Sequence, residues 1–187
     1  MFAYCGNNSV NREDPSGYFP SKQFSYICFD NGSEYPKPKR DVTIELGNAL
    51  EQAAIEIQEE KLAWTFLWGD TAMAQAFIWY GFYLRVNHAA PWDIKRKECW
   101  EQTIGTEFPG KNHGVLVGGM TMTPENIGNF TYGILGYLYD IPLDALIAGS
   151  WYAAGFPTDG EKLHNEIFDW HFVILGYQTV EQANKKG

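Results

Sequence analysis

The chain has little cysteine, no long apolar run and a shortage of positive charge. Its three cysteines are too few and too scattered for a disulfide framework or a zinc site. No apolar run approaches the roughly 20 residues of a membrane-spanning helix, and the start of the chain lacks the pattern of a signal peptide. The net charge of −9 argues against a protein that holds nucleic acid mainly by neutralising phosphates. A nuclease stays open, because a local basic patch can coexist with an acidic total.

Hydrophobic residues make up 45% of the chain and aromatic residues 16%, which is typical of a globular domain. Apolar positions at helical spacing predict a mainly α-helical, compact single domain over about residues 41–178, with at most a small β-hairpin near Val115. The first helix is predicted at about 41–64, with Asp41 as its N-cap and its apolar face formed by Ile44, Leu50, Ala54, Ile57 and Leu62. Residues 71–87 are apolar almost all round, so they are predicted to be the central buried helix.

Residues 123–136 carry the strongest local signal. Thr123 followed by Pro124 predicts a helix N-cap with proline at the first helical position. Ile127, Phe130, Ile134 and Leu138 fall on one side of this helix and are predicted to be buried.

The opposite side of the same helix carries Glu125, Asn129 and Tyr132 beside glycines. Each glycine inside a helix costs about 1 kcal/mol relative to alanine, so some feature must require the missing side chains. Either another backbone packs closely there, or a ligand lies there and is held by the polar residues. We weigh these alternatives equally for Gly128, Gly133 and Gly136.

Further polar groups lie on segments otherwise built for burial. Residues 91–96 place Trp92, Asp93 and Lys95 close together, although spacing alone favours a plainer interpretation, in which Asp93 is the N-cap of a short helix running to about residue 102. Asp140 followed by Ile141 and Pro142 predicts another helix start, and a last helix is predicted at about 161–177, followed by a frayed C-terminus. His164 and His171 on that helix are about 10.5 Å apart along its axis, too far to bind one zinc ion, and no metal or cofactor is predicted.

Two resemblances to known families point to a toxin. Residues 1–17, MFAYCGNNSVNREDPSG, resemble the phrase that closes the core of Rhs (rearrangement-hotspot) repeat proteins, with Ser9 where that family usually has proline. In that family a shell of β-hairpin repeats precedes a variable C-terminal toxin. The resemblance implies that residues 1–17 are a remnant of the core end, 18–40 a linker and 41–187 the toxin domain. It also implies that the natural chain begins upstream of Met1.

Residues 82–178 resemble the bacterial polymorphic toxin type 44 domain. The matching segments are Phe82-Tyr83, 91–95 (PWDIK), 123–136 (TPENIGNFTYGILG) and 169–176 (DWHFVILG), with Val173 where the family usually has isoleucine. The chain has 164–166 (HNE) where many members have a Gly-Asp pair. The resemblance implies a toxin for interbacterial competition, secreted and delivered to a target bacterium within a larger Rhs protein. Its implied partners are a cognate immunity protein and the parent Rhs shell.

The polar groups suggest an enzyme, and we expect them to line one cavity. The candidate catalytic residues are Asp93, Glu125 and Asp169, because paired carboxylates suit general acid–base work. The candidate substrate-binding residues are Trp92, Lys95, Asn129, Tyr132, Gly128 and Gly133. Carboxylates beside aromatic rings suit cleavage of a glycan, so the leading hypothesis is a hydrolase of peptidoglycan or a related wall glycan.

Two alternatives stay open: a nuclease, most simply one acting on RNA, and a non-enzymatic binding module. A basic cleft near Asp93 favours the nuclease and an acidic, aromatic cleft favours the glycan hydrolase. The absence of a cleft favours the binding module.

Overall fold

The computed structural model describes residues 40–185, so the core remnant predicted for residues 1–17 and all but the last residue of the linker predicted for 18–40 lie outside this range. The described part contains six helices and one two-stranded antiparallel hairpin, as predicted. The elements are α1 (Thr43–Trp68), α2 (Ala72–Val86), α3 (Lys97–Thr103), β1 (Val115–Val117), β2 (Met120–Met122), α4 (Pro124–Leu138), α5 (Leu143–Ala153) and α6 (Gly160–Asn184).

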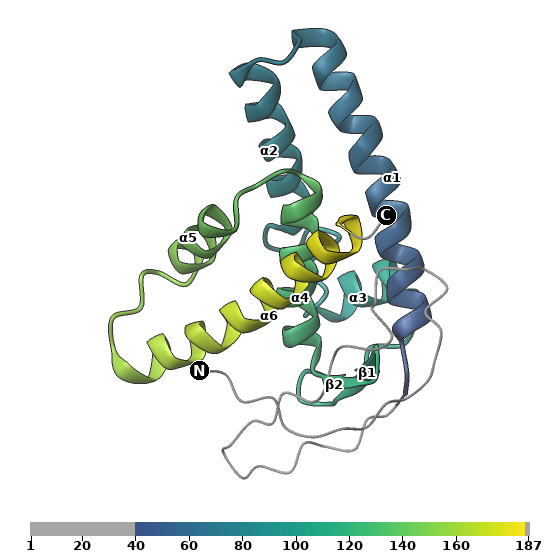
Figure 1. Cartoon of the computed structure of the whole chain (residues 1–187). Helices are drawn as coiled ribbons and strands as arrows, with labels where there is room; N and C mark the ends of the chain where they lie inside the picture. Colours follow the sequence, from purple (N-terminus) through teal and green to yellow (C-terminus); the bar gives the residue numbers. More distant parts are fainter. Residues whose placement is uncertain (1–39, 186–187) are drawn as a thin grey trace.

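The central helix is α4, and α6 crosses in front of it (Figure 1). As predicted, the Thr123 side chain caps α4 by accepting a hydrogen bond from the Asn126 backbone N–H. Ile127, Phe130 and Ile134 are fully buried and Leu138 is partly buried, so the predicted buried face of α4 is confirmed at its first three positions. This helix therefore forms the centre of the core.

Glycine allows α4 and α6 to cross at backbone contact. A Cβ atom at Gly133 would lie 2.0 Å from the Val173 carbonyl oxygen of α6, and one at Gly176 would lie 1.9 Å from the Phe130 carbonyl oxygen of α4. Gly136 faces the Leu146 side chain of α5 in the same way, at 2.3 Å. Close packing therefore explains two of the three glycines of α4, Gly133 and Gly136.

The hairpin of α1 and α2 projects from this body (Figure 1). The buried residues of α1 are Leu46, Gly47, Leu50, Ala53 and Ile57, so the predicted face was wrong at Ile44 and Leu62, which are exposed. Beyond Ile57 the helix passes the edge of the core. Residues 62–84, the outer parts of α1 and α2 with the turn between them, form an arm.

The prediction that residues 71–87 form the central buried helix was wrong. Helix α2 covers that range, with Thr71 as its N-cap, but Trp79, Tyr80 and Tyr83 are exposed on it. It packs mainly on α1, which covers only one of its sides. A helix with apolar side chains on all sides is therefore not buried on all sides.

Three predicted helix ends also differ. The N-cap of α1 is Val42, and Asp41 instead accepts hydrogen bonds from the backbone N–H and hydroxyl of Thr43. The N-cap of α5 is Pro142, because Asp140 has a left-handed backbone (φ 54°) and pairs with Lys61. Helix α6 continues to Asn184 instead of ending at about residue 177, and so includes residues 181–184 of the end that was expected to fray.

Candidate functional site

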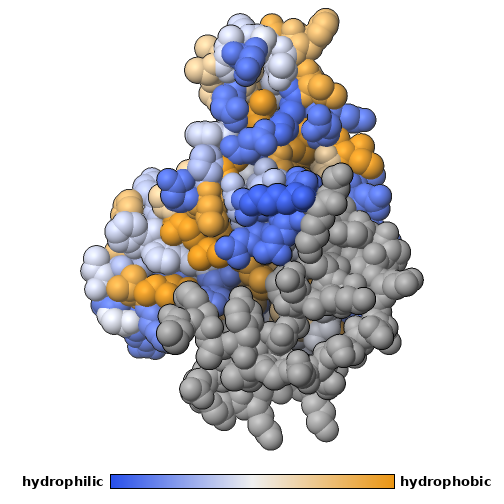
Figure 2. Space-filling view, in the orientation of Figure 1, coloured by the Kyte–Doolittle hydropathy of each residue, from blue (hydrophilic) through white to orange (hydrophobic). Residues whose placement is uncertain are grey.

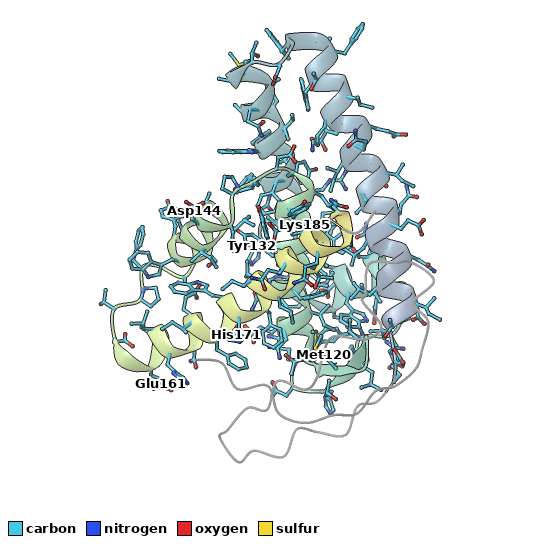
Figure 3. All side chains as sticks on the ribbon, in the orientation of Figure 1. Met120, Tyr132, Asp144, Glu161, His171 and Lys185 are labelled. Atoms are coloured by element: carbon cyan, nitrogen blue, oxygen red, sulfur yellow. The ribbon has the colours of Figure 1, made fainter. Side chains whose placement is uncertain are left out.

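A cavity of about 280 Å³ lies where α4, α5 and α6 meet the loop that follows α2. Figure 3 shows Tyr132 in this region. Four segments supply the lining: the loop residues Trp92–Lys95, the polar side of α4, the second half of α5, and α6. The exposed residues Lys95, Gly149 and Ala153 mark its open side. Its size is at the small end of ligand pockets, enough for one small group or one unit of a polymer.

The structure brings most of the predicted site residues to this cavity. The lining includes Trp92, Asp93, Lys95, Gly128, Asn129, Tyr132 and Asp169. Gly128 faces the loop with room for a side chain, since a Cβ atom there would lie 4.0 Å from the Lys95 backbone nitrogen, an ordinary contact distance. Of the three glycines of α4, this is the one that borders the cavity.

Two predicted site residues do not line it. Gly133 lies against the α6 backbone at the helix crossing, so its lack of a side chain serves packing and not substrate binding. Glu125 is exposed on the first turn of α4. Its charge still acts on the site, because it raises the pKa of Asp169.

Asp169 is the group whose chemistry this environment changes most. The pKa of its carboxyl is raised to about 6, chiefly by burial and then by the negative charges of Glu125 and Glu166, against the opposing effects of Lys95 and Asn129. An acid with this pKa holds its proton in weakly acidic solution and can release it near neutrality. Such a group can act as a general acid.

Glu166 is a site residue that the sequence analysis missed. It is 8% exposed, lines the cavity one helical turn before Asp169, and accepts a hydrogen bond from Trp170 Nε1 at 2.9 Å. The i, i+3 spacing of two acids on one helix was the available signal. It was overlooked because paired acids on a helix usually face solvent.

The Asp93 carboxylate is held by hydrogen bonds from its own loop and stabilises that loop. Its carboxylate accepts hydrogen bonds from the Ala89 backbone N–H, at 2.9 Å, and from Arg96 Nε, and it is 6% exposed. Ala89 has a left-handed backbone (φ 61°), which these contacts stabilise. Asp93 therefore fixes the loop that carries Trp92 and Lys95. The alternative that it caps a helix was wrong, since Arg96 is the N-cap of α3.

Two neutral groups of α4 complete the site. Burial raises the pKa of Tyr132 to about 12, so the phenol stays protonated, and it donates a hydrogen bond to the Leu146 carbonyl at 3.3 Å. The Asn129 amide lies near enough to lower the pKa of Asp169, yet its buried Nδ2 meets no acceptor in hydrogen-bonding geometry within residues 40–185. A buried donor without an acceptor costs about 1–3 kcal/mol, which a bound ligand can offset.

The arrangement suits acid–base chemistry on a small polar group. Carboxyls are available from two adjacent turns of α6, a cation from Lys95, and neutral donors from Asn129 and Tyr132. His164 is exposed and His171 partly buried on α6, and neither lines the cavity. Within the described range no three His, Cys, Asp or Glu side chains are grouped to hold a metal ion.

Comparison of the chain with protein-family models, with curated proteins and with solved structures gave no match.

Proposed function

We propose that this chain is a toxin domain that hydrolyses a glycosidic bond in peptidoglycan or a related cell-wall glycan. The observation that carries the proposal is the state of Asp169, a carboxyl with a pKa of about 6 in a cavity that other carboxylates border. Glycosidases combine one carboxyl that donates a proton with a second that acts as base or nucleophile. Their environments must push the two pKa values apart, and burial beside Glu125 and Glu166 does this for Asp169.

The proposed roles follow from the contacts. Asp169 donates a proton to the leaving-group oxygen of the scissile bond. Glu166, or Glu125 at the rim, acts as the second carboxylate. Asn129 Nδ2 and the Lys95 ammonium bind sugar hydroxyls, and the Trp92 loop, fixed by Asp93, forms an apolar wall.

The charge of the cavity favours the glycan over nucleic acid. Among residues 40–185, Asp93, Glu166 and Asp169 line it against one cation, Lys95, and Arg96 is already paired with Asp93. A phosphodiester needs several cations or a metal ion to offset its charge, whereas a neutral sugar does not. An acidic cleft with aromatic groups is what the glycan hypothesis required.

The first test is digestion of purified sacculi by the full 187-residue chain. Released reducing ends and soluble fragments are measured for the wild type, Asp169→Asn and Glu166→Gln, and Glu161→Gln is the matched control because Glu161 is an exposed acid on the same helix. We expect activity in the wild type and the control and a loss of at least about 100-fold in the two site variants. Cleavage of RNA that depends on Asp169, without release of reducing ends, would replace the proposal with a nuclease.

The second test is the compartment in which the chain is toxic. A wall hydrolase meets its substrate outside the membrane, so expression behind a secretion signal should cause lysis and cytoplasmic expression should not. Asn129→Ala should abolish killing in the exported form. Growth arrest from the cytoplasm alone contradicts the proposal.

A toxin of this kind also requires a cognate immunity protein. We propose that the product of the neighbouring gene binds this domain, and that a basic surface on it faces the acidic cavity and steers association. Binding should weaken when Glu166 and Asp169 are both neutralised. A neighbouring product that neither binds nor protects would remove this support for the toxin assignment.

A further inference from the structure

The arm, residues 62–84, exposes large apolar side chains, none of which lines the candidate site. Nine lie on it: Leu62, Phe66, Leu67, Trp68, Met73, Trp79, Tyr80, Tyr83 and Leu84. Phe66 is the most exposed of them, at 90%. The arm projects from the body (Figure 1), and Figure 2 shows hydrophobic surface reaching its free end. A single exposed apolar residue is ordinary, but a contiguous group of this kind marks an interaction surface.

The charges of the arm are as distinctive as its apolar groups. Between Lys61 and Arg85 the only charged residue is Asp70, in the turn at the tip. The two cations stand at the base, where Lys61 pairs with Asp140 and Arg85 with Glu56. Apart from Asp70, the projection carries no charge, and the paired charges stand at its base. This order resembles the profile of a bilayer, which is apolar inside and charged at the headgroups.

The exposed side chains point in several directions. Trp64 and Trp68 of α1 stack on Phe77 of α2, which fixes the faces where the two helices meet. Leu62 and Phe66 are roughly 160–200° from Trp64 around the α1 axis and so point away from α2. Figure 3 shows side chains leaving both outer edges of the arm. A protein partner with one flat face would cover one of these sides, whereas a lipid environment surrounds the arm.

The length of the arm allows entry into one leaflet. Gly81 faces Glu60 and Phe82 packs on Tyr139, so the projecting part of α2 ends before them. At about 1.5 Å per residue, 62–68 of α1 and 72–78 of α2 each span roughly 10 Å, against a half-thickness of about 15 Å for the hydrocarbon core. None of the helices of residues 40–185 is long and apolar enough to cross a membrane. Trp68, Trp79, Tyr80 and Tyr83 are of the residue types that concentrate at the membrane–water interface.

We propose that the arm inserts its tip into one leaflet of a lipid bilayer and holds the chain at a membrane surface. The driving force is burial of apolar side chains, so neutral lipids suffice and anionic lipids are not required. The proposal does not depend on the hydrolase activity.

The test is flotation of the full chain with neutral phosphatidylcholine vesicles in a density gradient. The wild type should float. Phe66→Glu should lower the partition coefficient by about tenfold or more, because a charged group replaces an apolar one at the tip. Ile44→Glu is the matched control: Ile44 is exposed on the same helix, at 61%, but lies at the opposite end, and this variant should float like the wild type. Asp70→Asn should float more strongly, because it removes the one charge of the arm.

Several outcomes would overturn the proposal. The wild type could stay in the bottom fraction, or Ile44→Glu could lose binding as strongly as Phe66→Glu. Binding confined to anionic vesicles and released by 0.5 M salt would mean contact with headgroups only. A dimer in sedimentation velocity that Phe66→Glu dissociates, without flotation of the wild type, would assign the arm to a second copy of the chain. Unchanged flotation of Asp70→Asn would place the turn outside the bilayer.

Discussion

Where α4 and α6 cross, glycine at positions 133 and 176 lets the two backbones touch. In the arm, by contrast, two helices carry large apolar side chains that are exposed. Both regions are rich in apolar residues, and both depart from the usual helix with one apolar and one polar side. At the crossing, tight packing places Asn129, Tyr132 and Asp169 around one cavity. In the arm, the exposed apolar side chains form the surface that we propose contacts a lipid bilayer. The difference shows that the apolar content of a helix does not by itself tell whether the helix is buried or exposed.

The largest expected effect is at the crossing itself. Gly176→Ala places a methyl group 1.9 Å from the Phe130 carbonyl oxygen, and backbone cannot move aside as a flexible side chain can. We expect the free energy of unfolding, measured by urea denaturation, to fall by at least about 3 kcal/mol. Gly160→Ala, at the start of the same helix with open space around it, should change stability by less than about 0.5 kcal/mol. Similar values for the two variants would mean that the helices do not cross at backbone contact.

The next effect is at the joint between the arm and the body. The buried Tyr139 hydroxyl donates a hydrogen bond to Glu60 at 2.8 Å and accepts one from Arg85 Nε at 2.7 Å, linking α1 and α2 to the end of α4. Tyr139→Phe should cost about 2 kcal/mol, because two charged groups lose a partner. Tyr137→Phe, which loses only a 3.4 Å bond to Asn184, should cost less than about 0.5 kcal/mol. Equal losses in urea denaturation would contradict the role of this joint.

The two regions also differ in how far the sequence predicted them. Helix α4 could be predicted in detail, because Thr123 and Pro124 mark its start and its buried positions recur at helical spacing. Grouping Asp93, Asn129 and Asp169 was possible because each is a polar group on a segment built for burial. Which of the α4 glycines serves packing could not be predicted, since that depends on where α6 crosses.

The arm shows the opposite case. The composition of residues 71–87 suggested the most buried helix of the protein, yet a helix is buried only where neighbours cover it, and α1 covers one side of α2. The start of α5 was missed for a related reason: Asp140 forms an ion pair with Lys61 of α1, a contact between distant segments that replaces capping. Local sequence patterns predict where the helices lie. The contacts between helices decide which of their residues are buried and which polar residues act as caps.

A smaller effect should appear at the site as a pH dependence of stability. Because the pKa of Asp169 is higher in the folded chain, about 6, than its ordinary value of 3.8, the folded state binds the proton more tightly. Stability should therefore fall as the pH rises from about 4 to about 6 and stay lower above that. Asp169→Asn removes the cost of the charge, so at pH 7.5 it should stabilise the chain by about 1 kcal/mol after solvent screening, with no gain at pH 3. Glu161→Gln keeps Asp169 and should follow the wild type across this pH range, and a destabilised Asp169→Asn at pH 7.5 would contradict the raised pKa.

The smallest expected effect is at the tip of the arm, and it makes the sharpest contrast with the core. Phe66 is 90% exposed and Phe130 is 1% exposed, so the same change, phenylalanine to alanine, removes the same atoms from water in one place and from packed protein in the other. Phe66→Ala should change the free energy of unfolding by less than about 0.5 kcal/mol, whereas Phe130→Ala should cost about 3–5 kcal/mol. Urea denaturation of both variants with the wild type measures this difference. A loss above about 1 kcal/mol for Phe66→Ala would mean that its side chain is covered in the folded chain in solution. The arm would then be part of the core, and its apolar surface would not be available to a membrane.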